Sequence, residues 1–244
     1  EAMAKRRIGL GFLGLGSALV MLGIRYDSEQ GLAFGARIAQ AMRDEAYRAS
    51  VDLAVEKGAF PALEAERYLQ SGFARRLPDD IRSAVAERGI RNSHLLSIAP
   101  TGTIALAFAD NASNGIEPAF AWSYTRRKRM ADGSTQEYAV EDHAYRLFRE
   151  RGGDAQCLPA AFVSALDMTA EQHLQMLVAV QPFIDSSISK TVNVPGDYRF
   201  EAFRGLYMQA WKAGLKGLAT YRPNSVTGAV LSVEAPAAVD AAPD

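Results

Sequence analysis

The feature that most constrains this chain is a short apolar segment followed by a small polar loop and a helix start. Residues 94–99 read His-Leu-Leu-Ser-Ile-Ala, residues 100–103 read Pro-Thr-Gly-Thr, and an apolar run covers residues 104–108. This order predicts a strand, a loop and the first turns of a helix. A helix start presents unpaired backbone N–H groups and a positive dipole end, which suit an anion such as a phosphate. The same pattern is also typical of an ordinary capped helix after a strand.

Strands and helices alternate along the rest of the chain, which predicts an α/β fold with largely parallel strands. Helices are predicted over residues 17–22, 28–57, 63–70, 79–88, 142–151, 169–180 and 200–213, and strands over residues 94–99, 187–194 and 215–221. Asp132 and Gly133 form the turn of a predicted β-hairpin. The last two strands enclose a helix, so they predict a right-handed βαβ unit.

Three of these elements have informative side-chain patterns. In residues 187–194, Ser, Thr and Asn alternate with apolar residues and Lys190, which predicts a strand with one polar face. That face either looks into a site or is simply half-exposed to solvent. Two helices show apolar stripes that we expect to be buried. The stripes comprise Phe34, Ile38, Ala41, Met42, Ala49 and Leu53 in the long helix, and Phe200, Phe203, Tyr207, Ala210 and Trp211 in the last one.

Several other motifs favour structural roles. Gly9, Gly11 and Gly14 match the spacing of a dinucleotide-binding loop, but little strand precedes them, so we interpret them as points of close backbone packing. The basic run at residues 126–129 suits an anionic partner, but acidic residues follow nearby, which favours a solvated hairpin strand. Residues 233–244 are rich in Ala and Pro, which predicts a disordered linker or tail after a domain over residues 1–232.

Composition excludes several classes of protein. The formal net charge of −1 argues against a general nucleic-acid binder. One cysteine excludes an internal disulfide framework and a CxxC metal site. No apolar run reaches transmembrane length, and no signal peptide is recognised. We therefore expect a cytoplasmic protein without a metal site, a membrane or a nucleic acid as partner.

Four segments are more distinctive together than any one of them alone. They are residues 5–19 (KRRIGLGFLGLGSAL), residues 99–104 with 113–118 (APTGTI and SNGIEP), residues 185–195 (DSSISKTVNVP) and residues 210–222 (AWKAGLKGLATYR). In this order they resemble the C-terminal half of the ribonucleotide reductase catalytic subunit, most closely its adenosylcobalamin-dependent class II. The oxygen-dependent class carries a Tyr-Tyr pair near residues 219–222, and the presence of Tyr221 alone favours the cobalamin class.

The resemblance implies a fold, a reaction and a site. The fold would be the C-terminal half of a ten-stranded α/β barrel, which needs the N-terminal half in the same chain, a separate chain or a second copy. The reaction would be radical reduction of ribonucleotides, as in a ribonucleoside-diphosphate reductase, with adenosylcobalamin as cofactor. Matching positions assign the substrate phosphates to Pro100, Thr101, Gly102, Thr103 and Ile104, and a structural or supporting role to Glu117 and Pro118.

The chain also departs from the family pattern. The family's radical cysteine lies in an Asn-x-Cys-x-Glu loop, and no such run occurs here. Cys157 lies in a Gly/Ala/Pro-rich connector, so we interpret it as structural and assign no catalytic residue. We therefore predict that the isolated chain has no reductase activity. The alternative is a non-catalytic nucleotide-binding or assembly module associated with a complete reductase. An unrelated phosphate-binding enzyme would have to explain all four segments.

Overall fold

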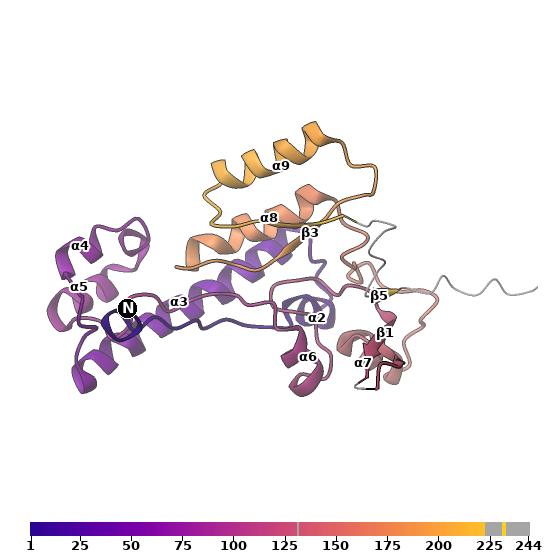
Figure 1. The fold of residues 1–244 in the computed structure, drawn as a ribbon, viewed down its shortest axis with the longest axis horizontal. Helices are drawn as coiled ribbons and strands as arrows, with labels where there is room; N and C mark the ends of the chain where they lie inside the picture. Colours follow the sequence, from indigo (N-terminus) through magenta and orange to yellow (C-terminus); the bar gives the residue numbers. More distant parts are fainter. Residues whose placement is uncertain (131, 223–230, 233–244) are drawn as a thin grey trace, which may run out of the picture.

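The computed structural model describes residues 1–130, 132–222 and 231–232. A long helix, α3, runs through the molecule, and α8 and α9 lie above it in successive layers in the view of Figure 1. Helices α4 and α5 gather at one end of the molecule, and β1 and α7 lie at the other. Residues 233–244, for which we predict a linker or tail, lie outside the described residues.

Most predicted helices are confirmed, and their caps explain where they begin and end. The helices are α1 (Ala2–Lys5), α2 (Leu15–Met21), α3 (Glu29–Lys57), α4 (Ala65–Leu69), α5 (Asp79–Arg88), α6 (Gly102–Phe108), α7 (His143–Glu150), α8 (Ala170–Val180) and α9 (Phe200–Lys212), with short 3-10 turns η1 (Ala74–Arg76) and η2 (Gln181–Phe183). The Ser28 side chain caps α3, and Thr169 and Gln172 form a reciprocal capping box at α8.

The strands predicted at residues 187–194 and 215–221 are shorter than predicted, as the bounds of the strands show. They are β1 (Ser123–Arg129), β2 (Thr135–Glu141), β3 (Thr191–Asn193), β4 (Ala219–Tyr221) and β5 (Leu231–Ser232). Strands β3 and β4 pair in parallel on either side of α9 in the sequence, which confirms the βαβ connection. The hairpin of β1 and β2 is confirmed, with β5 on the other edge of β1. These sheets do not close into a barrel within the described residues.

The segment at residues 94–99, expected to be a strand, is extended but makes only single bridges. Leu96 bridges Leu10, and Ile98 bridges Ile188, both in parallel. Backbone hydrogen bonds from Ile98 and Ser189 continue the second contact. Three segments from distant parts of the chain therefore lie side by side, and the central one leads directly into Pro100.

The buried face of α3 differs from the predicted stripe. Its buried residues are Gly31, Gly35, Ala39, Arg43, Tyr47, Ser50, Val51 and Ala54. Of the predicted stripe, Ala41, Ala49 and Leu53 are exposed, and the other three residues are half-buried. Small residues face inward because neighbouring segments approach closely; a Cβ on Gly35 would lie 2.8 Å from Met176 Sδ. Phe34, Ile38 and Met42 still pack against the core from its margin, so hydrophobicity alone indicates a face that is shifted from the buried one.

Of the stripe predicted for α9, Ala210 alone is fully buried. Leu206 and Ala210 are buried, whereas Phe200 is 70% exposed and Trp211 is 72% exposed. Leu206 and Ala210 lie four positions apart, so α9 is covered along one narrow face, and the rings of Phe200 and Trp211 lie outside that face.

Gly9 and Gly11 are sites of close packing, as predicted, whereas Gly14 has a left-handed backbone, φ 81°, and a Cβ there would lie 3.5 Å from Ala112 Cβ, an ordinary contact. A Cβ on Gly9 would lie 2.4 Å from Ser97 Oγ, and a Cβ on Gly16 would lie 2.7 Å from Glu117 O. Glycine is therefore required because another segment's backbone or side chain occupies the space of a side chain. No helix in the described part of the chain is long and apolar enough to cross a membrane.

Replacing Gly11 by Ala is expected to lower the free energy of unfolding by about 1–3 kcal/mol, because overpacking forces backbone shifts. The new Cβ would lie 2.3 Å from the carbonyl oxygen of Ser97, which belongs to the backbone and cannot rotate away. Urea unfolding of Gly11→Ala and of Gly72→Ala gives the comparison, since a Cβ at Gly72 meets nothing within 4 Å. Equal stability of the two variants would contradict the close-packing interpretation.

Candidate active site

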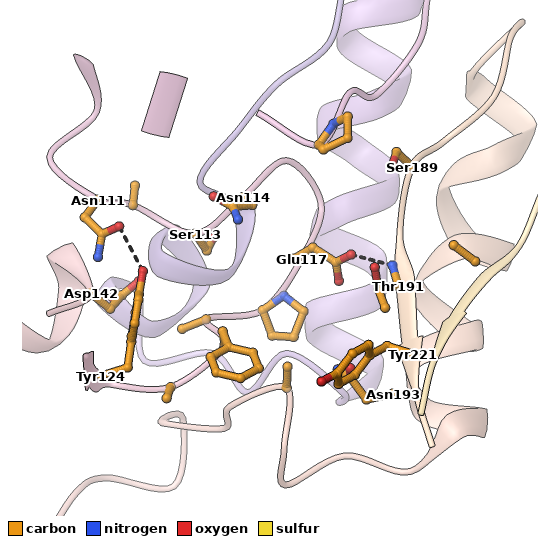
Figure 2. Close-up of a pocket in the computed structure, with 18 of the residues that line it drawn as sticks. Asn111, Ser113, Asn114, Glu117, Tyr124, Asp142, Ser189, Thr191, Asn193 and Tyr221 are labelled. Carbon is orange, nitrogen blue, oxygen red and sulfur yellow. Dashed lines mark hydrogen bonds between the residues drawn. The ribbon is translucent and has the colours of Figure 1, made fainter. Parts of the chain in front are cut away.

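A pocket of about 600 Å³ opens between the segment at residues 111–121, strand β3 and strand β4. Figure 2 shows side chains from these segments pointing into it. It is lined by Pro100, Asn111, Ala112, Ser113, Asn114, Glu117, Pro118, Ala119, Phe120, Ala121, Tyr124, Asp142, Ala165, Ser189, Thr191, Asn193, Ala219, Thr220 and Tyr221. The pocket therefore joins three of the four distinctive sequence segments.

The predicted phosphate loop meets the pocket at its first residue. Of residues 100–104, Pro100 lines the pocket, whereas the side chains of Thr103 and Ile104 are exposed. Thr101 has a left-handed backbone, φ 56°, and its Oγ1 accepts a hydrogen bond from Gly115 N at 2.9 Å. A Cβ on Gly102 would lie 3.6 Å from Asn114 Nδ2. The loop is thus fixed against the segment that forms one pocket wall.

Glu117 lines the pocket and is held from behind, a role that goes beyond the structural one expected from the sequence. Its Oε2 accepts a hydrogen bond from Lys190 Nζ at 2.6 Å. Its Oε1 accepts one from Thr191 N at 2.5 Å, which Figure 2 shows as a dashed line. The Lys190 side chain is 0% exposed, and the Glu117 side chain is 20% exposed. These two hydrogen bonds tie the segment that contains Glu117 to the start of β3. Pro118 lies beside it in the lining.

Lys190 also contacts a buried imidazole. Its Nζ lies 3.0 Å from His173 Nδ1, and His173 Nε2 lies 3.0 Å from the carbonyl oxygen of Ala165. Because a carbonyl can only accept, Nε2 carries the hydrogen and Nδ1 accepts from the ammonium. Burial, together with the charge of Lys190, lowers the pKa of His173 to about 3, so this ring is neutral. Burial also lowers the pKa of Lys190, against the opposing effect of Glu117.

A second carboxylate, Asp142, lies on the opposite side of the pocket from β3 (Figure 2). Its Oδ2 accepts from Ser17 Oγ at 2.8 Å, and its Oδ1 accepts from Ala144 N at 2.8 Å, which caps α7. Burial raises the pKa of Asp142, although these hydrogen bonds partly offset the effect. The sequence predicts a helix here, but no local signal indicates a pocket residue.

The polar face of the predicted strand looks into the site. Ser189, Thr191 and Asn193 line the pocket, whereas Lys190 and Val192 point the other way and are buried. The polar face is therefore partly exposed, as one interpretation of the alternating pattern expects, and the space it faces is this pocket. His173 and Asp142 were missed, because their partners are remote in sequence.

The pocket has a simple charge pattern. Among the described residues that line it, Glu117 and Asp142 carry acidic groups, and none is Lys, Arg or His. Cys157 is a free thiol, exposed in the connector between α7 and α8 and outside this lining. Within the part of the chain that the structure describes, no group of three or more His, Cys, Asp or Glu side chains is arranged to hold a metal ion.

Comparison with known proteins identifies the family. The family model described as ribonucleotide reductase, barrel domain, matches residues 1–221. The vitamin B12-dependent ribonucleoside-diphosphate reductase of Mycobacterium tuberculosis is 36% identical over 96% of this chain and 33% of its own length. The vitamin B12-dependent ribonucleotide reductase of Streptomyces coelicolor is 30% identical over 95% of this chain and 29% of its own length.

A third relative, the vitamin B12-dependent ribonucleoside-diphosphate reductase of Thermoplasma acidophilum, is 29% identical over 93% of this chain and 29% of its own length. The chain thus spans about a third of the length of these curated relatives. Because the family model covers nearly all of the described residues and three of the four distinctive segments meet in one pocket, the chain belongs to the ribonucleotide reductase family, as part of its barrel domain.

Proposed function

We propose that this chain forms one wall of the substrate site of a vitamin B12-dependent ribonucleotide reductase, which converts ribonucleoside diphosphates to deoxyribonucleotides by radical chemistry. The observation that carries the proposal is that separate segments of the chain meet in one pocket. Pro100, residues 113–118 and residues 189–193 are far apart in the sequence, yet each contributes side chains to the same pocket. The names of the relatives support the reaction and the diphosphate substrate.

Residues 100–104 are the proposed site of the substrate phosphates. The first N–H groups of α6 have no partner within the helix, as at any helix start. Thr101 Oγ1 accepts from Gly115 N, so its own hydroxyl hydrogen is free to donate to a phosphate oxygen. Thr103 is exposed and adds a second hydroxyl. Neutral donors suffice here, because backbone N–H groups and a helix dipole together stabilise a phosphate.

The rest of the reductase must supply the radical chemistry. Cys157 is the only cysteine in the sequence, and it is exposed outside the pocket. We therefore propose that the radical cysteine and the reducing cysteine pair come from the N-terminal half of the barrel, in the same chain or in a separate one. The parallel pair β3–β4 and the extended segments beside it would then be part of the completed barrel. The isolated chain is expected to be inactive.

Adenosylcobalamin is the cofactor that the relatives' names imply. The described pocket does not fit it alone. Its 600 Å³ match a ligand of nucleotide or drug size, and a corrinoid is much larger. No His that could bind cobalt lines it in the described residues. We therefore propose that the cofactor is held mainly by other parts of the reductase, and we assign no residue of this chain to it.

Complementation tests the proposal. This chain is combined with a separately made N-terminal half of a vitamin B12-dependent reductase, and deoxyribonucleotide formation from ADP is measured with adenosylcobalamin. We expect activity only when both parts are present. Thr101→Ala and Thr103→Ala are expected to lower kcat/KM about tenfold each, because one hydrogen bond to a charged group is worth about 1.5–3 kcal/mol.

Two controls sharpen this experiment. Thr101→Ser keeps the hydroxyl and is expected to retain activity, and Ser83→Ala removes an exposed hydroxyl on α5, away from the pocket. Nucleotide binding by the assembly without any turnover would favour the non-catalytic binding module instead. Full activity of the Thr101→Ala and Thr103→Ala double variant would contradict the phosphate assignment.

A further inference from the structure

A fully buried lysine lies directly behind the pocket wall. The ammonium of Lys190 has three N–H groups and three partners: Glu117 Oε2 at 2.6 Å, His173 Nδ1 at 3.0 Å and the ring of Tyr26, whose centroid is 5.7 Å away. A buried charge is tolerated only when it is paired and hydrogen-bonded in this way. Because its position is so fully determined, Lys190 holds whatever it contacts in one geometry.

The partners of Lys190 come from separate parts of the fold. His173 belongs to α8, Tyr26 precedes α3, and Glu117 belongs to the pocket wall. The Tyr26 hydroxyl also donates to the carbonyl oxygen of Ile116 at 2.5 Å, so the residue before Glu117 is fixed as well. Thr191 N occupies the other carboxylate oxygen. The orientation of Glu117 is thus set by contacts on its inner side.

The outer side of Glu117 remains available to a ligand. A carboxylate has about four acceptor positions, and the described contacts use two of them. The side chain is 20% exposed and lines the pocket, so its remaining positions face the cavity. An ionised carboxylate only accepts hydrogen bonds, and it repels phosphate. The group that it recognises must therefore be an uncharged or cationic donor.

The other residues that line the pocket indicate which group of a ligand supplies that donor. Pro118, Ala119, Phe120, Ala121 and Ala165 give the pocket an apolar portion that suits the flat face of a nucleobase. Pro100 marks the proposed phosphate end. In a nucleotide, the sugar lies between phosphates and base, and its hydroxyl groups are the donors at that position. Ser189, Thr191 and Asn193 line the same polar side as Glu117.

We propose that Glu117 accepts a hydrogen bond from a ribose hydroxyl of the bound nucleotide, and that Lys190 is a positioning residue that acts through Glu117. This assignment rests on the function proposed above. It makes Glu117 and Lys190 determinants of the preference for a ribonucleotide over a nucleotide that lacks sugar hydroxyls. Neither residue transfers a proton or an electron in this role.

Equilibrium binding tests the assignment without turnover. The assembly of this chain with the complementing half of a reductase is titrated with ADP and with 2′,3′-dideoxy-ADP, in the absence of cobalamin and reductant. We expect the unmodified assembly to prefer ADP about tenfold, which corresponds to about 1.4 kcal/mol. In Glu117→Gln and in Lys190→Met the preference should fall below about twofold, while affinity for the dideoxy compound stays within about twofold.

A double variant separates positioning from a purely structural role. Lys190→Met alone leaves the Glu117 carboxylate in the pocket wall with only its hydrogen bond from Thr191 N, whereas Glu117→Gln with Lys190→Met removes both charges, so that neither is left without its partner. If Lys190 acts through Glu117, adding Lys190→Met to Glu117→Gln changes the preference no further. The surface pair Glu56 and Lys57, 3.6 Å apart, provides matched controls, and Glu56→Gln and Lys57→Met should keep the tenfold preference.

Each remaining outcome has one meaning. A preserved tenfold preference in Glu117→Gln, or an equal loss of affinity for both ligands, would overturn the assignment of Glu117 to the sugar. A preserved preference in Lys190→Met, with Glu117→Gln defective, would overturn the positioning role of Lys190. An unmodified assembly that binds neither nucleotide would refute the proposed function itself, and this assignment with it.

Discussion

Replacing Asp185 by Ala is expected to lower the free energy of unfolding by about 4 kcal/mol. The buried carboxylate accepts from Leu95 N at 2.7 Å, from Leu96 N at 3.0 Å and from the hydroxyl of Tyr47 at 2.8 Å. Removing it leaves these buried donors without an acceptor, and each unsatisfied donor costs about 1–3 kcal/mol. The same carboxylate joins α3 to the segment that leads into Pro100, so the loop beside the pocket should lose its support.

Urea unfolding of the 244-residue chain measures this effect. Asp52→Ala is the matched control, because Asp52 is exposed and makes a surface ion pair with Arg88 at 3.3 Å. Such pairs contribute about 0–1 kcal/mol. Asp185→Asn should fall between the two, because its amide keeps one acceptor and turns an N–H toward the other donors. If Asp185→Ala proved no less stable than Asp52→Ala, Asp185 would not be the anchor that the contacts indicate.

Acidification should destabilise the chain through His173. Burial and Lys190 lower its folded pKa to about 3 from the ordinary value of 6.5, so below pH 6.5 the unfolded chain binds a proton that the folded chain does not. Stability from this group is therefore complete above pH 6.5 and is lost as the pH falls toward the folded pKa. Between pH 7.5 and pH 5 the expected loss is about 2 kcal/mol, since one pKa unit corresponds to about 1.4 kcal/mol.

The His173→Asn variant isolates this contribution. Asn places an oxygen near the position of Nδ1, so it can still accept from Lys190, but it does not titrate. We expect the variant to be less stable at pH 7.5, because Ala165 O loses its donor, and the difference to shrink by about 2 kcal/mol at pH 5. Unfolding free energies of both chains at the two pH values give this difference. A constant difference would show that His173 is not held neutral by the fold.

Sequence reasoning was most reliable where the determining interactions are local. The capping box of Thr169 and Gln172, the start of α3 at Ser28 and the end of α5 before Gly89 are all confirmed. Each depends on residues within about four positions, so each is encoded in a short stretch of chain. The apolar stripes were only partly right, because the buried face of a helix depends on how closely its neighbours approach. Gly35 and Ala39 on α3 are buried for that reason.

The candidate site likewise divides into features that local sequence determines and contacts that only the tertiary structure determines. The sequence alone determined the family resemblance, through motifs that include residues 100–104 and 113–118. It also determined the alternation that places Thr191 and Asn193 on one face of β3. The tertiary structure alone decided that Glu117 lines the pocket and that Lys190 holds it, because this contact joins residues 73 positions apart. Tyr26 and Ile116 are 90 positions apart, and Ser17 and Asp142 are 125 apart. Local propensity cannot encode such pairs; they form only when burial makes an unpartnered polar group costly.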